Sequence, residues 1–345
     1  MKYSIIISYK ESGEDRKNNL KRLLNYLSWL LNADTEIVLV EQDNESKIDW
    51  LNEIKNHEYI NHLFVKNDDI FNKGWGCNIG AKESKGDFLA FNDSDMFIKL
   101  ESYRHSLNLL RQFDVVNPYR AIYYLDEDNI NKFVNSNYNF NIVISHNPTQ
   151  VSVISGGIFM IRKDKYLSLK GFDENCFGYG HEDDILDMKI KKMDLKVQTL
   201  NDIAIHINHQ GITKNDDYYS FQSVNKILFN EYVDMTPINL LQKIENIESF
   251  GDTDKKIVSS TKNIRYELYK QSAEILLDSI LSNINTEFVE DLIKESAKKG
   301  ADYAYDMFIT SFMDKLNKEF SNVKFTEKDK KTLVEKIISR MNYDE

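Results

Sequence analysis

A pair of acidic side chains directly follows an apolar run. Asp93-Ser94-Asp95 comes after residues 88–92, FLAFN, which have the character of a buried strand. Two carboxylates two residues apart at a strand end can both point into the crevice beyond it. Such a pair suits a hard divalent cation that also holds a diphosphate. An isolated Asp-x-Asp is usually only a polar turn, so the hypothesis of a metal site depends on the position of this one directly after a strand.

Two further groups of residues are chemically suggestive. Residues 177–184 place Tyr179 between two glycines, followed by three consecutive acids, at the predicted start of a helix. The helix dipole alone favours acids there, but helix capping does not require the flexible glycine-aromatic-glycine segment. His206 and His209 lie three residues apart beside a polar, glycine-containing stretch. Two histidines at that spacing could reach one metal ion.

The elements that must position these residues follow from the hydrophobic periodicity. Short runs of β-branched residues alternate along the chain with segments whose apolar residues recur at helical spacing. This alternation predicts a parallel sheet covered by helices on both faces. Ligands bind beyond the carboxyl ends of such strands. The predicted strands are 3–8, 36–40, 62–65, 87–92 and 151–161, and the predicted helices are 20–31, 49–55 and 76–84. Residues 126–149 are expected to form a surface loop or irregular hairpin, and Lys189–Lys192 a solvated helix face.

Composition excludes several classes of protein. With 44 basic and 55 acidic residues, the net charge of -11 argues against a general nucleic-acid binder. The two cysteines, Cys77 and Cys176, exclude a disulfide scaffold and a four-cysteine zinc site. Residues 1–345 show neither a signal peptide nor a membrane span, so a cytoplasmic location is expected.

Two regions differ in character along the chain. We predict an α/β catalytic domain over 1–235 and a helical region of unknown role over 236–345, where apolar residues recur on long charged helices and glycine is scarce. Peripheral membrane contact, through the basic run, and a homo-oligomer, through the helical region, stay open.

Together the motifs resemble a known family. Over about residues 3–215 the chain looks like a GT-A fold glycosyltransferase, between family 2 and the β-1,4-galactosyltransferase-like family 7. Five pieces occur in the expected order: IIISYKES, VLVEQDN, the segment from FNKGWG to NDSDMF, the segment from SGGIFMI to HEDDILD, and HINHQ. The resemblance implies a Rossmann-like, mainly parallel sheet flanked by helices, followed here by an all-helical appendage.

The resemblance also implies roles for individual residues. Lys73 replaces an arginine of the galactosyltransferases, and Tyr179 a tryptophan that packs on donor and acceptor. Gly156 and Gly157 would let the backbone approach the donor sugar. The expected donor-binding set is Ser8, Tyr9, Glu11, Asp43, Lys73, Asp93, Ile154, Gly156, Gly157 and Tyr179.

The same resemblance implies the catalytic machinery. Glu182 and Asp183 match the acidic pair that binds and activates the acceptor, with Asp183 as general base. Asp95 would ligate Mn²⁺ or Mg²⁺, His209 would complete the site, and Asp93 and His206 would take part. Imidazole together with carboxylate suits Mn²⁺ somewhat better.

One departure from the galactosyltransferases bears on the donor sugar. In that family the side chain two positions before the first glycine of the pair limits the space at the donor's C2 substituent. A tyrosine there favours galactose, and smaller residues admit an N-acetyl group. Because this chain has Ile154 there, the resemblance implies UDP-GalNAc as donor, with UDP-Gal next.

The sequence therefore predicts an enzyme: a metal-dependent, inverting transferase that moves a hexose or N-acetylhexosamine from a UDP-sugar to a glycan hydroxyl. The bacterial-looking composition suggests surface polysaccharide synthesis. Two alternatives stay open: a sugar-nucleotide nucleotidyltransferase, although 8–17 lack its glycine-rich basic loop, and a non-catalytic binding protein derived from a transferase.

Overall fold

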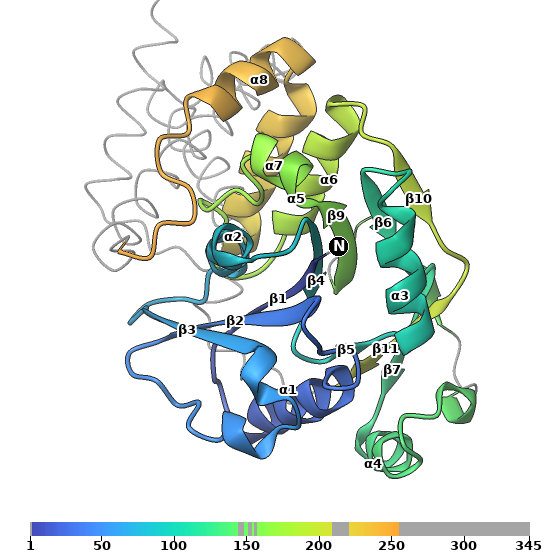
Figure 1. Ribbon diagram of the computed structural model, residues 1–345. Helices are drawn as coiled ribbons and strands as arrows, with labels where there is room; N and C mark the ends of the chain where they lie inside the picture. Colours follow the sequence, from blue (N-terminus) through green and yellow to red (C-terminus); the bar gives the residue numbers. More distant parts are fainter. Residues whose placement is uncertain (1, 144–147, 151–153, 155–156, 209–220, 255–345) are drawn as a thin grey trace, which may run out of the picture. The chain divides into compact units, whose positions relative to one another are not determined.

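The computed structural model describes residues 2–143, 148–150, 154, 157–208 and 221–254 (Figure 1). The chain divides into two units, 1–258 and 259–345, and the second lies wholly outside the described residues. The helical region predicted for 236–345 is thus described only as far as α8 (Pro237–Glu245) and the residues up to 254. The predicted domain boundary after residue 235 remains a prediction.

A seven-stranded sheet forms the centre of the described part of the chain, in the order β10-β6-β9-β4-β1-β2-β3. Its strands pair in parallel except β9, which is antiparallel to both β4 and β6. The mainly parallel sheet expected from the sequence is confirmed. The strands are β1 (Tyr3–Tyr9), β2 (Thr35–Asp43), β3 (Ile60–Lys66), β4 (Phe88–Asn92), β6 (Val115–Asn117), β9 (Ile158–Arg162) and β10 (Val197–Thr199).

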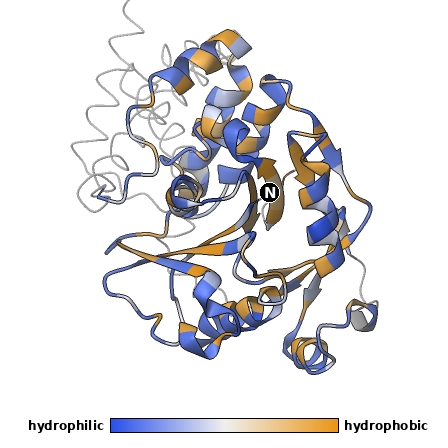
Figure 2. Cartoon of the chain, in the orientation of Figure 1, coloured by the Kyte–Doolittle hydropathy of each residue, from blue (hydrophilic) through white to orange (hydrophobic). Residues whose placement is uncertain are grey.

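Alternating side chains of β1 divide between two layers of helix. Ile5 and Ile7 belong to the core cluster that includes four leucines of α1 (Glu14–Leu27). Ile6 faces the opposite way, toward Gly80 of α2 (Lys73–Glu83), where a Cβ would lie 2.5 Å from Ile6 Cγ2. Successive strand residues point to opposite faces of the sheet. A continuous apolar run therefore buries side chains on both faces when helices cover both. In Figure 2 most of β9 is orange, for hydrophobic residues, whereas the helices mix blue and orange.

A smaller four-stranded sheet, in the order β5-β11-β7-β8, lies beyond the end of β4. It contains β5 (Met96–Phe97), β7 (Ala121–Leu125), β8 (Thr149–Gln150) and β11 (Ile203–Ile207). β11 runs antiparallel to β5, with His206 opposite Met96. This pairing brings residue 206 beside the end of the Asp-Ser-Asp motif, a contact that sequence spacing does not reveal.

The remaining helices in the described residues are α3 (Leu100–Leu109), α4 (Glu127–Asn135), α5 (Lys163–Ser168), α6 (Glu182–Lys192) and α7 (Gln222–Asp234). The loop or hairpin predicted for 126–149 is wrong over its first part, because Asp126 caps α4 and Ile130 and Phe133 bury one face of it. A 3-10 turn follows at Phe140–Val143. The helix predicted for 49–55 is reduced to a 3-10 turn at Leu51–Glu53.

The basic run on α6 is not the solvated face that the sequence predicts. Lys189 is fully buried and donates to the carbonyls of Gly171 (2.9 Å) and Leu169 (3.4 Å). Lys192 donates to two carbonyls near the end of α7, and Lys191 pairs with Asp187. The run therefore joins elements together. Among the described residues, no helix is both long and apolar enough to cross a membrane.

Candidate active site

Lys73 stands at the first turn of α2, which begins beyond the carboxyl end of β3. Asn72 caps this helix: its Oδ1 accepts the Trp75 N–H at 2.9 Å, and its Nδ2 donates to the Glu174 carbonyl at 2.8 Å. The side chain of Gln42, at the end of β2, holds Asn72 from the other side: its Nε2 donates to the Asn72 carbonyl and its Oε1 accepts the Asn72 N–H. The position of Lys73 is therefore fixed by contacts to two other segments.

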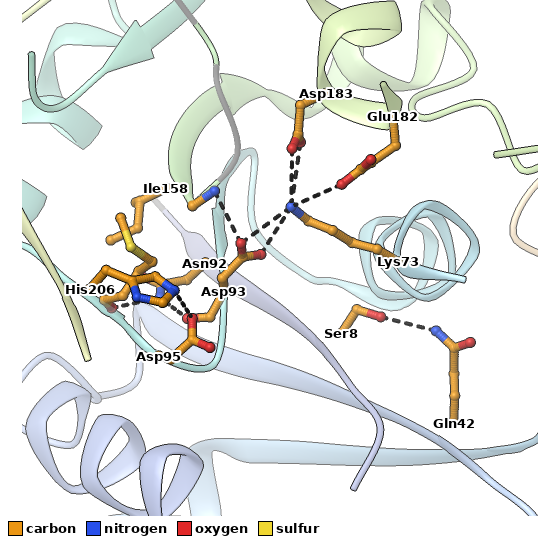
Figure 3. A network of polar contacts seen from close by, with 12 residues as sticks. Ser8, Gln42, Lys73, Asn92, Asp93, Asp95, Ile158, Glu182, Asp183 and His206 are labelled. Carbon is orange, nitrogen blue, oxygen red and sulfur yellow. Dashed lines mark hydrogen bonds and ion pairs between the residues drawn. The ribbon is translucent and has the colours of Figure 1, made fainter. Parts of the chain in front are cut away.

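Three carboxylates from two further elements surround the Lys73 ammonium (Figure 3). Asp93, which follows β4, places Oδ1 at 3.1 Å from Nζ. From the first turn of α6, Asp183 Oδ2 lies at 3.4 Å and Glu182 Oε1 at 3.8 Å. The structure thus brings Asp93 of the Asp-Ser-Asp motif and the acidic pair at the start of α6 to one cation.

Burial and charge together shift the proton affinities of this group. Burial raises the pKa of Asp183 well above its usual range, Glu182 and Asp93 push it the same way, and Lys73 opposes them. Burial works to lower the pKa of Lys73, but Asp183, Asp93 and Glu182 outweigh it, and the pKa lies above its ordinary value. The ammonium keeps its proton, while Asp183 acquires the raised proton affinity that suits a general base.

Asp93 is also held from the side of β9. Its Oδ2 accepts the Gly157 N–H at 3.1 Å, and its own N–H donates to the Gly157 carbonyl at 2.8 Å. Gly157 has a φ of 82°, and a Cβ there would lie 2.7 Å from the Tyr119 hydroxyl and 2.8 Å from Met96 Cε. Glycine is required because the backbone is left-handed and closely approached. The main chain of Gly157, expected to approach the donor sugar, is hydrogen-bonded to Asp93 in this structure.

Asp95 turns toward β11, where His206 Nε2 lies 3.6 Å from its Oδ1. This carboxylate–imidazole pair has the donor types that suit Mn²⁺. Within the described residues, no group of three or more His, Cys, Asp or Glu side chains forms a metal cluster. His209, the predicted further ligand, lies outside those residues.

The ends of β1 and β2 form the predicted nucleoside side. Ser8 Oγ accepts from Gln42 Nε2 at 3.0 Å, and Asp43 pairs with Lys47 at 2.9 Å. Tyr9 is buried, and burial raises the pKa of both Tyr9 and Glu11. Ser8, Tyr9 and Asp43 thus occupy the carboxyl ends of adjacent parallel strands and Glu11 lies just beyond one of them, where ligands of such sheets bind.

The other predicted residues are placed less completely. Ile154 is buried, whereas Tyr179 is 46% exposed. Gly156 lies outside the described residues. A hollow of about 390 Å³ lies at the amino ends of β1, β2 and β3, beside Tyr3 and Tyr59, and none of the predicted site residues lines it.

Sequence reasoning missed residues that act through the site's own members. Tyr119 receives the Ile158 N–H at its hydroxyl (3.2 Å), and Asn92 Nδ2 donates to the Asp93 carbonyl (2.7 Å). Gln42 holds Ser8 and Asn72 together. Gln42 and Asn92 could have been found from the sequence, because they are polar residues at the ends of otherwise apolar strands. No sequence pattern near Tyr119 indicates its contact with β9.

Comparison with known proteins gives a family match. Residues 4–230 match the family described as glycosyltransferase like family 2. No curated protein matches the chain. Solved structures with similar folds include S. aureus TarS 1–349 in complex with UDP-GlcNAc, which is 14% identical with a TM-score of 0.47, over 87% of this chain and 92% of that chain. Another is the catalytic domain of Drosophila β1,4-galactosyltransferase 7 in complex with xylobiose, which is 16% identical with a TM-score of 0.40, over 69% and 83%.

Proposed function

The chain belongs to the glycosyltransferase-like family 2, and from this premise we propose that it is a metal-dependent, inverting enzyme that uses a UDP-sugar donor. The transferase class and the GT-A arrangement of mainly parallel sheet and flanking helices agree with the sequence prediction. The family match favours this function over the nucleotidyltransferase and the non-catalytic binding protein. One observation supports it most: Asp93 and Asp183 face the same Lys73 ammonium.

In the proposed reaction Asp183 accepts the proton of the acceptor hydroxyl as that oxygen attacks the anomeric carbon. Its raised pKa makes it a stronger base than an ordinary aspartate. Glu182, one residue before it, would hold the acceptor through a second hydroxyl. Lys73, which pairs with Glu182 and Asp183, would present its ammonium to the departing diphosphate.

The donor would lie along the carboxyl ends of β1, β2 and β4. Ser8, Tyr9, Glu11 and Asp43 would contact the nucleoside, and Tyr179 would pack on the sugars. Asp95 and His206 would hold Mn²⁺ (or Mg²⁺), with Asp93 and His209 as further predicted ligands. When bound, the cation neutralises charge on the departing diphosphate.

The donor sugar is proposed from one side chain. Ile154 is smaller than a tyrosine and would leave room for an N-acetyl group, so UDP-GalNAc is the first choice and UDP-Gal the second. The acceptor is proposed to be a glycan hydroxyl in bacterial surface polysaccharide synthesis, which rests on composition alone.

A donor screen tests the proposal. Purified full-length protein is incubated with Mn²⁺, each UDP-sugar and candidate sugar acceptors, and released UDP is measured. We expect release with UDP-GalNAc that chelation removes and that Asp183→Asn lowers by about 10²–10⁴-fold while UDP still binds. Asp184→Asn is the matched control, because Asp184 is the next residue of α6 but pairs with His181 instead of Lys73. UDP-Gal used well with UDP-GalNAc ignored would overturn the donor choice, and intact UDP-sugars throughout would overturn the function.

A further inference from the structure

The loop that follows β2 folds back around a buried carboxylate. Glu41 is fully buried near the end of the strand, two residues before Asp43. Its Oε1 accepts the Lys47 N–H at 2.7 Å, and its Oε2 accepts the Ser46 hydroxyl at 2.7 Å. The strand therefore holds residues 46 and 47 of its own following loop.

A third contact comes from the neighbouring strand. His62 of β3 places Nε2 2.9 Å from Glu41 Oε2, with its side chain 20% exposed. In the parallel register His62 lies opposite Leu39, so the imidazole reaches along the sheet to the carboxylate. Glu41 thus ties both the loop and β3 to the end of β2.

The charge state of Glu41 strengthens these contacts. Burial alone raises the pKa of this carboxyl, but the hydrogen bonds from His62, Lys47 N–H and Ser46 outweigh it and hold the pKa below its ordinary value. The carboxylate is therefore ionised, and hydrogen bonds to an ionised acceptor are stronger than neutral ones. Because it is wholly buried, Glu41 cannot itself touch a ligand.

The consequence appears at Asp43. The main chain of Lys47 is fixed by Glu41, and the Lys47 ammonium lies 2.9 Å from Asp43 Oδ2. The other oxygen, Oδ1, accepts the Asn44 N–H at 2.9 Å. Both oxygens of Asp43 are thus oriented by the loop that Glu41 holds closed.

We infer that Glu41 and His62 are positioning residues for the donor nucleoside. They keep the 43–47 loop in the shape that presents Asp43 at the carboxyl end of β2. The inference rests on the proposed function, since Asp43 is a nucleoside contact only if the chain binds a UDP-sugar.

Substitution of His62 tests this directly in the full-length protein. His62→Leu removes the donor to Glu41, and we expect the KM for the donor and the Kd for UDP to rise about tenfold, with kcat and acceptor KM nearly unchanged. His62→Gln keeps an N–H that can reach Glu41 and should restore most of the affinity. Asn61→Leu is the control and should leave donor affinity unchanged, because Asn61 is the preceding residue of β3 and its side chain lies on the opposite face of the sheet.

A second variant avoids any dependence on the folding of the first. Ser46 is exposed, so Ser46→Ala removes one hydrogen bond to Glu41 without disturbing the core, and should raise the UDP Kd about threefold. Lower thermal stability of His62→Leu with unchanged UDP affinity in both variants would overturn the inference. Wild-type protein that binds no UDP would instead overturn the proposed function.

Discussion

Lys73 faces carboxylates that no stretch of sequence brings together. Asp93 follows β4, and Glu182 and Asp183 begin α6, yet all three lie within 3.8 Å of one ammonium. Each is only partly exposed, so their mutual repulsion is weakly screened. A lysine at this position therefore stabilises the ionised form of the proposed base, and its removal has a predictable sign.

Lys73→Met removes the positive charge that opposes the raised pKa of Asp183. The pKa then rises further. Because the base must be deprotonated to accept a proton, the acidic limb of the kcat/KM profile should move to higher pH and the rate at neutral pH should fall. Profiles of kcat/KM against pH for both proteins measure this, since they report the groups of the free enzyme.

Lys82→Met is the control for that experiment. Lys82 lies on the same helix, near its far end, and pairs with Asp252 at 2.8 Å. The acidic limb of the kcat/KM profile of Lys82→Met should match that of the wild type. An acidic limb that stays in place or moves to lower pH in Lys73→Met would refute the electrostatic assignment.

At the scale of elements, α2 is placed by its cap and by its glycines. Gly80 packs against Ile6, and a Cβ at Gly76 would overlap Ser8 Oγ, so the helix lies close on the sheet at some cost in helix propensity. Asn72 then sets where the helix begins and so where Lys73 points. A change in the cap should affect the site as well as stability.

Asn72→Ala should lower the free energy of unfolding by about 1–2 kcal/mol, the usual cost of losing a helix cap. It should also lower the transfer rate of the folded enzyme, because the first turn of α2 carries Lys73. Denaturant unfolding, with the rate measured per folded molecule, separates the two effects.

Asp126→Ala supplies the matched cap. Asp126 accepts the Asn129 N–H at 3.0 Å at the start of α4, which carries none of the proposed site residues. It should lose comparable stability, about 1 kcal/mol, with the rate unchanged. Equal loss of rate in both variants would show that the cap of α2 has no special link to the site.

At the scale of the whole molecule, Lys189 is an ionisable group in the core. It donates to the Gly171 carbonyl, and its ammonium lies 5.5 Å from the Tyr232 ring centroid, while the Tyr232 hydroxyl donates to Asp173 at 2.7 Å. Burial lowers the pKa of Lys189 to about 8, against an opposing effect of Asp173. The group joins α6, α7 and the 169–173 segment, but its charged form is disfavoured there.

This predicts a pH dependence of folding stability. Between about pH 8 and the ordinary lysine pKa, the unfolded chain binds more protons at this residue than the folded chain does, so stability from this group rises with pH. The full effect is on the order of 3 kcal/mol. Unfolding free energies of wild type and Lys189→Met, compared across that range, isolate it because other groups cancel. A difference independent of pH would contradict the prediction.

Several elements followed from the sequence because their causes are local. Periodicity alone predicted the strands over 3–8, 36–40 and 87–92 and the helix α1. Their apolar side chains must be buried whatever element they pack against, so the pattern does not depend on the partner. The polar segment 126–149 was misread because α4 buries only a narrow stripe around Ile130 and Phe133. Lys189 was misread because a charged residue on a helix is ordinarily solvated.

The candidate site divides in the same way. Residue types and spacing singled out Asp93, Asp95, Glu182 and Asp183 as candidates, although a polar turn and helix capping are their ordinary structural explanations, and the family resemblance implied their roles. Only the tertiary structure decided that Lys73 lies among three of them and that His62 reaches Glu41 across the sheet. The resemblance implied that Asp95 and His206 share a site, and the pairing of β11 with β5 is what brings them together. These contacts depend on strand order and register, which are set by packing between segments distant in the chain and leave no local pattern to read.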